Sequence, residues 1–215
     1  MNNKYQLLIF DWDGTLMDSI EWIVHCIQQS AKHCQHPTPS NTACRNIIGL
    51  SLEKAMQQLF PGITSTTYTE MVDCYRALFF SKTASRDHLF PGTYEMLKEF
   101  HNDGFMLAVA TGKSRAGLDR ALAATETACF FSATRCADEA LSKPNPLMLQ
   151  QLLQETNTSE NQALMIGDSI HDLEMAYNAG IDSVGVSCGA HHEAQLLQHQ
   201  PLTCLQQTTE LMNLL

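Results

Sequence analysis

Carboxylates follow directly after the first apolar run of the sequence. Tyr5–Phe10 has the character of a buried strand, and Asp11 and Asp13 come immediately after it, ahead of Gly14. A carboxylate can attack phosphorus as a nucleophile, and a second one two residues further along an extended backbone lies on the same side. We therefore expect Asp11 to accept a phosphoryl group and Asp13 to pass a proton to the leaving oxygen.

Later segments carry further polar groups beside predicted strands. Thr111 and Gly112 follow the second strand, Lys143 precedes the helix after the third, and Asp168 and Asp172 follow the fourth. The carboxyl ends of the strands in an open α/β sheet meet at one edge, where such proteins bind ligands. We therefore expect these groups to lie together, although they are far apart in the sequence.

Several carboxylates at one sheet edge predict a bound cation, because close carboxylates raise one another's pKa unless a positive charge neutralises them. Oxygen ligands with few imidazoles are typical of Mg²⁺ sites. Thr111, with nearby backbone N–H groups, and Lys143, as a point charge, would hold the phosphoryl oxygens as negative charge builds there. Each residue alone is more often a turn, a helix cap or a solvated side chain, so only the combination supports chemistry.

The elements that would position these residues alternate between strands and helices. The predicted strands are Tyr5–Phe10, Phe105–Ala110, Ala128–Ser132, Ala163–Ile166 and Ser183–Val186. Apolar periodicity predicts buried helix faces within Leu118–Leu122, Leu149–Leu153 and Leu173–Tyr177, the last closed by Gly180. Such alternation implies parallel pairing, so the predicted fold class is α/β, a doubly wound parallel sheet with a Rossmann-like core.

A long insertion separates the first predicted strand from the second. Apolar stripes of helical period run from Ile20 to Ala31, from Leu52 to Leu59 and from Met71 to Phe79. We therefore predict a helical cap domain at residues 19–86, inserted into an α/β catalytic core made of residues 1–18 and 87–215.

The composition restricts the class of protein and its partners. The 215 residues are 44% hydrophobic and 17% charged, and no apolar run approaches the ~18 residues of a membrane helix. The formal net charge of -10 disfavours nucleic acid and anionic membranes as partners. The start of the sequence lacks a signal-peptide pattern, and the eight cysteines have no repeated spacing. We expect a cytoplasmic protein with buried free thiols, and the sequence does not predict its oligomeric state.

Four segments resemble the motifs of the haloacid dehalogenase superfamily. They are Asp11-Trp-Asp-Gly-Thr-Leu16, Ala110-Thr-Gly112, Ser142-Lys-Pro-Asn-Pro146 and Ile166-Gly-Asp-Ser-Ile-His-Asp172. The sequence is similar in particular to the phosphoglycolate phosphatase and β-phosphoglucomutase-like branch, which Phe90-Pro-Gly92 and Ala179-Gly180 also match. The resemblance covers nearly the whole chain and is weakest in the helical insertion.

The resemblance implies a role for each motif residue. Asp11 would be the aspartyl-phosphate nucleophile and Asp13 the acid and base. Mg²⁺ would be held by Asp11, the backbone carbonyl of Asp13 and Asp168, with Asp172 supporting the metal shell. The residues that would bind phosphate are Asp11, Thr111, Gly112 and Lys143. The insertion would be a cap that opens to admit substrate and closes to exclude water.

The implied activity is that of a phosphatase acting on a small phosphorylated metabolite, such as phosphoglycolate or a sugar phosphate. Asp13 favours phosphate esters, because dehalogenase members of the superfamily and phosphonoacetaldehyde hydrolase lack an aspartate there. A β-phosphoglucomutase-like phosphosugar mutase would use the same four motifs. A non-catalytic regulatory module is the alternative outside enzymes, although no catalytic position is missing.

Residues outside the motifs have less specific interpretations. The loop from Arg45 to Ser51 is the part of the insertion that we expect to face the site. Arg45, ahead of a break that contains Gly49, would bind a second anionic group of the substrate. We expect His171 to be a surface or supporting residue, and the pair His191 and His192 to edge a helix in a late loop.

Overall fold

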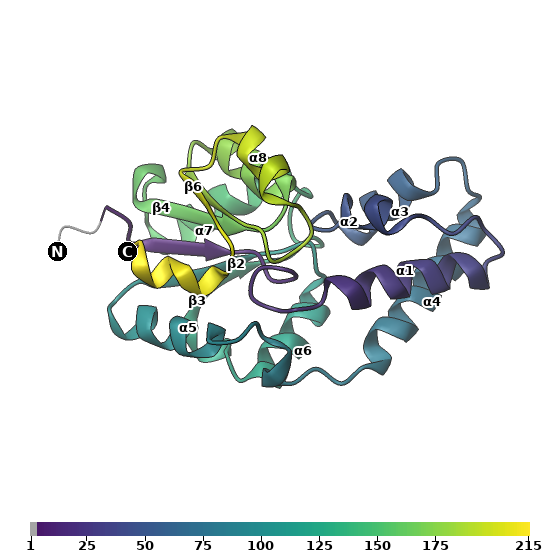
Figure 1. The fold of residues 1–215 in the computed structure, drawn as a ribbon, viewed down its shortest axis with the longest axis horizontal. Coiled ribbons are helices and arrows are strands. Elements are labelled where there is room, and N and C mark those ends of the chain that lie inside the picture. The colour runs from purple at the N-terminus through teal and green to yellow at the C-terminus, as the bar shows by residue number, and fades with distance from the viewer. Residues whose placement is uncertain (1–3) are drawn as a thin grey trace.

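The structure, a computed structural model, describes residues 4–215 and has two parts (Figure 1). One part is a six-stranded sheet with helices on both faces. The other consists of the helices between the first two strands, which are α1 (Ile20–His33), α2 (Asn41–Arg45), α3 (Leu52–Leu59) and α4 (Ser65–Ser81). Residues 1–3, with which the predicted core segment begins, lie outside the described residues.

The strands are all parallel and lie in the order β3-β2-β1-β4-β5-β6. They are β1 (Leu7–Phe10), β2 (Met106–Ala110), β3 (Phe131–Arg135), β4 (Ala163–Gly167), β5 (Asp182–Val186) and β6 (Thr203–Leu205). This order confirms the predicted doubly wound α/β class. The strand order reverses between β1 and β4, and ligands of such sheets bind at that switch point.

Two strand predictions need correction. The third strand begins three residues later than predicted, because Ala128–Phe130 form a 3-10 turn and the strand is Phe131–Arg135. The edge strand β6 was not predicted, and none of its three residues is fully buried. A short, half-exposed edge strand has little of the apolar pattern by which strands are recognised.

The side chains of the central strand alternate between two cores. Leu8 and Phe10 lie in the core under α5 (Thr93–Asn102) and α6 (Arg115–Thr125). Leu7 and Ile9 lie in the core under α7 (Leu147–Thr156) and α8 (Ile170–Ala179). A strand that is buried on both faces has an uninterrupted apolar sequence, as β1 does. The remaining helix is α9 (Glu193–Leu196), and 3-10 turns lie at Arg86–His88, Ala128–Phe130, Glu160–Gln162, Leu197–His199 and Thr208–Asn213.

The predicted helix faces are buried, with one exception. Tyr177 in α8 is 81% exposed, so its assignment to the apolar face was wrong. The buried face of α8 is centred on Asp172, Met175 and Ala176, and this orientation turns Tyr177 toward solvent. The helix ends as expected at Gly180, whose φ of 71° is in the left-handed region.

The insertion has a core of its own. Ile23, Val24 and Ile27 on α1 are buried together with Met71 and Val72 on α4, and the two helices pack against each other. Its helices begin at polar residues that cap the backbone, such as Ser40, Ser51 and Thr64. The apolar stripes of the sequence therefore form a real core, and the assignment of residues 19–86 as a separate cap domain stays a prediction.

Two expectations from composition can be compared with the structure. No helix within residues 4–215 combines the length and apolar character that crossing a membrane would require. All eight cysteines are free thiols, but only Cys26, Cys44 and Cys136 are buried and Cys129 is exposed. The expectation of free thiols is confirmed, and that of general burial is wrong.

Replacing Leu152 with alanine should lower the free energy of unfolding by about 2–5 kcal/mol, because the cavity left in a core is only partly refilled. Leu152 is fully buried under the sheet. The control Leu202→Ala deletes the same atoms from a side chain that is 57% exposed and should change that free energy by less than about 0.5 kcal/mol. Denaturant unfolding measures both, and equal effects would contradict this packing.

Candidate active site

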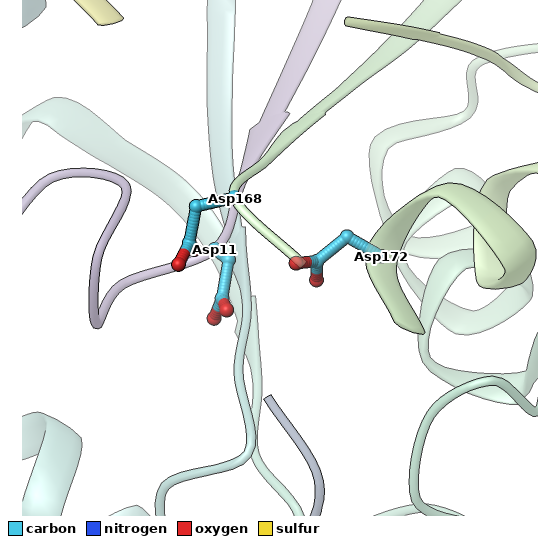
Figure 2. A group of neighbouring side chains, drawn as sticks. All are labelled: Asp11, Asp168 and Asp172. Atoms are coloured by element: carbon cyan, nitrogen blue, oxygen red, sulfur yellow. The ribbon is translucent and has the colours of Figure 1, made fainter. Parts of the chain in front are cut away.

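Three aspartates meet at the switch point of the sheet (Figure 2). Asp11 follows β1, and its backbone N–H donates to the carbonyl of Ile166 in β4 at 3.0 Å. Asp168 follows β4, and Asp172 lies in the first turn of α8 with its carboxylate directed toward the other two. All three are buried, and each offers a carboxylate oxygen within 4.8 Å of the others. The structure thus brings together the aspartates that the sequence assigned to this edge.

Lys143 is the cation that contacts this cluster. Its Nζ lies 3.0 Å from Oδ1 of Asp11 and 2.5 Å from Oδ1 of Asp172, and its side chain is fully buried. A buried charge is costly unless it is paired, and both contacts of Lys143 are ion pairs. Three buried carboxylates nevertheless face this one ammonium group, so negative charge is in excess at the cluster.

The pKa values of the cluster reflect burial and this excess charge. Burial raises the pKa of Asp11 to about 7, although the ammonium of Lys143 opposes the shift. Burial also raises the pKa of Asp168 well above its ordinary value, and the charges of Asp11 and Asp172 add to the effect. Burial lowers the pKa of Lys143, but the two carboxylates outweigh it and leave that pKa above its ordinary value. Excess carboxylate charge on hard oxygen donors fits a divalent cation such as Mg²⁺.

Neighbouring groups hold the Asp168 carboxylate in place. Its Oδ1 accepts a hydrogen bond from the Thr15 hydroxyl at 2.8 Å, and its Oδ2 accepts one from the Ala190 backbone N–H at 2.7 Å. A Cβ atom added at Gly14 or at Gly189 would lie 2.1 Å from Oδ2 of Asp168. Glycine at both positions therefore leaves room for this carboxylate, and Gly14 also has a φ of 81°.

Asp13 forms a separate ion pair that the sequence did not reveal. The Nζ of Lys113 lies 2.8 Å from Oδ2 of Asp13, and the hydroxyl of Ser19 donates to Oδ1 at 2.6 Å. Lys113 lies two residues after Thr111, on a loop that we predict to be part of the site, and this position could have identified it as a site residue. Nothing in the spacing identified Asp13 as its partner, because the two residues belong to different strand ends.

Thr111 and Gly112 follow β2 at the same edge. Thr111 is buried, and its Oγ1 accepts a hydrogen bond from the Lys113 backbone N–H at 3.2 Å. A Cβ atom at Gly112 would lie 2.4 Å from the carbonyl oxygen of Leu50, so only glycine lets the insertion approach this closely. With Asp11 and Asp13, these two residues line a cavity of about 350 Å³.

The loop between α2 and α3 rests on the sheet part. The Ser51 backbone N–H donates to the Ser142 hydroxyl at 2.9 Å, and Gly49 lines the cavity as expected. The carbonyl of Asn46 is hydrogen-bonded to Nε2 of His171 at 2.9 Å. His171 is buried, so a position at the protein surface, one of the two predicted for it, was wrong. Its hydrogen bond to Asn46 connects α8 to the insertion.

Arg45 lies outside the cavity. Its Nη1 donates to the carbonyl of Gly189 at 3.0 Å, and its guanidinium also forms an ion pair with Glu21. Arg45 ends the short helix α2, and these two contacts direct its side chain toward the loop after β5. The structure therefore does not place Arg45 where it could bind the substrate, which corrects the sequence-based expectation.

His191 and His192, in the segment after β5, differ in burial. His192 precedes α9 as expected, whereas His191 is buried and does not lie at a helix edge. Its ring packs against that of His171, with centroids 6.0 Å apart. Burial lowers the pKa of His191 to about 4, and the neighbouring His171 adds to the shift. His191 is therefore a neutral packing residue near neutral pH.

Comparison with known proteins identifies the family. The profile of the haloacid dehalogenase-like hydrolases matches residues 8–186. The chain is 34% identical over 199 residues to "Probable phosphatase IndB" of Dickeya dadantii, across 91% of this chain and 86% of that one. It is 31% identical over 205 residues to a phosphoglycolate phosphatase of Vibrio cholerae, across 91% and 90%.

Solved structures agree on the fold. The crystal structure of a predicted phosphoglycolate phosphatase from Haemophilus somnus has a TM-score of 0.89 to this structure at 22% identity, covering 100% of this chain and 99% of that one. Since the family match spans both the sheet part and the insertion, the chain belongs to the haloacid dehalogenase-like hydrolases.

Proposed function

We propose that the protein is a phosphatase that hydrolyses a small phosphomonoester with Mg²⁺, through an aspartyl-phosphate on Asp11. The observation that carries the proposal is the buried cluster of Asp11, Asp168, Asp172 and Lys143 beside a cavity of about 350 Å³. The relatives named phosphatase and phosphoglycolate phosphatase support the same reaction class.

The surroundings of Asp11 suit a nucleophile. Its Oδ1 accepts a hydrogen bond from the Trp12 backbone N–H at 2.7 Å and pairs with Lys143, so Oδ2 is the oxygen available to attack phosphorus. Attack forms the bond from Asp11 to phosphorus and breaks the bond from phosphorus to the ester oxygen. Asp11, the backbone carbonyl of Asp13 and Asp168 would hold Mg²⁺, which supplies positive charge that favours ionised Asp11 and offsets phosphoryl charge.

Asp13 is positioned for the proton transfers. Lys113 and Ser19 hold its carboxylate from two sides at the wall of the cavity. Protonated Asp13 gives its proton to the leaving ester oxygen, and it then takes a proton from the water that attacks the phosphorus of the aspartyl-phosphate. Inorganic phosphate and free Asp11 result, so the residues return to their starting states.

The remaining residues hold the phosphoryl group and cover the site. Thr111, the backbone of Gly112 and Lys143 would bind its oxygens as charge develops. Residues 19–86 would act as a cap, because the loop with Gly49 and Leu50 lies directly against Gly112. Exclusion of water by this cap would strengthen the electrostatic contacts inside.

Substitution Asp11→Asn should abolish phosphate release, with a loss in kcat of at least about 1000-fold, because the amide cannot serve as the nucleophile. Phosphate release from a panel of small phosphomonoesters measures the effect. The control Asp119→Asn changes an aspartate whose side chain is 59% exposed on α6 and should retain full activity. Activity of Asp11→Asn close to that of the wild type would contradict the proposal.

Added Mg²⁺ should stabilise the metal-depleted protein. At a concentration about 100 times its Kd, a ligand of the folded state contributes about 2.7 kcal/mol. For a chain of this size, this corresponds to a rise in Tm of roughly 5–10 °C. Asp168→Asn removes a proposed ligand, so its Tm should barely respond to Mg²⁺ in thermal unfolding after EDTA treatment. The same rise in both proteins would show that Mg²⁺ binds elsewhere.

A further inference from the structure

The cavity beside Asp11 has two chemically different walls. The sheet part supplies polar side chains, among them those of Asp11, Asp13, Thr111 and Lys113. The insertion supplies mainly apolar and aromatic side chains from α1 and α4, among them Ile23, Ile27, Tyr68, Val72, Tyr75 and Phe79. A phosphomonoester also has two parts, and its phosphate must lie at the polar wall. The alcohol part therefore faces the apolar wall.

The apolar wall includes an aromatic face of α4. Tyr68, Val72, Tyr75 and Phe79 follow one another at intervals of three and four residues, so they lie on one side of the helix. The rings of Tyr75 and Phe79 are stacked, with centroids 5.7 Å apart and an interplanar angle of 16°. Both side chains are only half-buried. The Nζ of Lys113 lies over the Phe79 ring, so Tyr75 is the ring of this pair that can offer a surface to a further ring.

The charges in the cavity disfavour a second anionic group on the substrate. Its lining includes four acidic side chains, Asp11, Asp13, Glu53 and Asp138, but two basic ones, Lys113 and Arg76. Lys113 pairs with Asp13 at 2.8 Å, whereas Arg76 has a side chain that is 59% exposed and lies 4.0 Å from Asp73. A carboxylate in this cavity would therefore meet an excess of acidic side chains, and the largely buried cation beside it, Lys113, is already paired.

The apolar wall begins beside the proposed acid. The Nζ of Lys113, which pairs with Asp13 at 2.8 Å, lies 4.6 Å from the centroid of the Phe79 ring. The aromatic face and the Asp13 carboxylate therefore lie next to the same ammonium group. Carbon atoms attached to the ester oxygen would meet this region directly.

We propose that the substrate is a phosphomonoester whose alcohol carries an aromatic ring and no second anionic group. This inference rests on the proposed phosphatase function. The cavity of about 350 Å³ is larger than the ~150 Å³ that accommodates benzene in a protein core, which leaves room for a phosphate. A two-carbon acid such as glycolate would fill little of the apolar wall and would bring a charge to it.

The test compares two alkyl esters, 2-phenylethyl phosphate and phosphoglycolate, with the wild-type protein and Mg²⁺. Both release an alkoxide, so the ratio of their kcat/KM values reports on the cavity rather than on the leaving group. Apolar contacts of this size discriminate by roughly 10–200-fold, and we expect the aromatic ester to be favoured at least tenfold. A smaller ratio, or preference for phosphoglycolate, would overturn the inference while leaving the phosphatase function intact. Absence of phosphate release from every ester would overturn both.

A pair of tyrosine variants tests the role of the aromatic face. Tyr75→Leu keeps the wall apolar but removes a ring, and it should lower the ratio of the two kcat/KM values by about twofold or more. Tyr177→Leu makes the same change at a side chain that is 81% exposed on α8, and its ratio should equal that of the wild type. A ratio for Tyr75→Leu within twofold of wild type would contradict the aromatic contact. The wild-type comparison decides the question independently if this variant does not fold.

Discussion

The structure of the site depends on the burial of more negative charge than its one buried lysine can balance. Asp11, Asp168 and Asp172 are held together at the carboxyl edge of the sheet, and Lys143 pairs with two of them. Burial of unbalanced charge is costly, so this arrangement needs support from the fold and favours the binding of a cation. The apolar strands β1 and β4 supply that rigid support, because both are buried on both faces.

Close packing around the cluster follows from the same constraint. The Asp168 carboxylate occupies space that a side chain at Gly14 or Gly189 would fill, and Gly112 lets the insertion come into contact with the end of β2. The insertion then closes the cavity with apolar residues of α1 and α4. In the proposed function, one half of the site would act on the phosphate, and the other half would set which alcohol can accompany it.

Much of this arrangement could be predicted from the sequence, because its signals are local. The strands β1, β2, β4 and β5 have distinct apolar runs. Asp11, Thr111 and Asp168 follow three of these strands directly, and Lys143 precedes helix α7, so a parallel sheet brings all four to one edge. The helical insertion was visible as three stripes of helical period.

The remainder depends on contacts between distant segments. Lys113 pairs with Asp13 from a different strand end. Arg45 is held outside the cavity by its contacts with Glu21 and Gly189. His191 is buried against His171 of α8. No periodicity or spacing specifies such partners. The edge strand β6 and the start of β3 were missed for a different reason, since half-exposed segments have weak apolar patterns.

The central claim, that Asp11 accepts the phosphoryl group, can be tested by trapping the intermediate. A phosphomonoester labelled in its phosphate is mixed with the protein and Mg²⁺, the reaction is quenched in acid within the first turnover, and the labelled peptide is mapped. We predict acid-stable label on the peptide that contains Asp11, and none in Asp11→Asn. Turnover of the ester with label on another residue, or with no labelled protein at any quench time, would contradict the account.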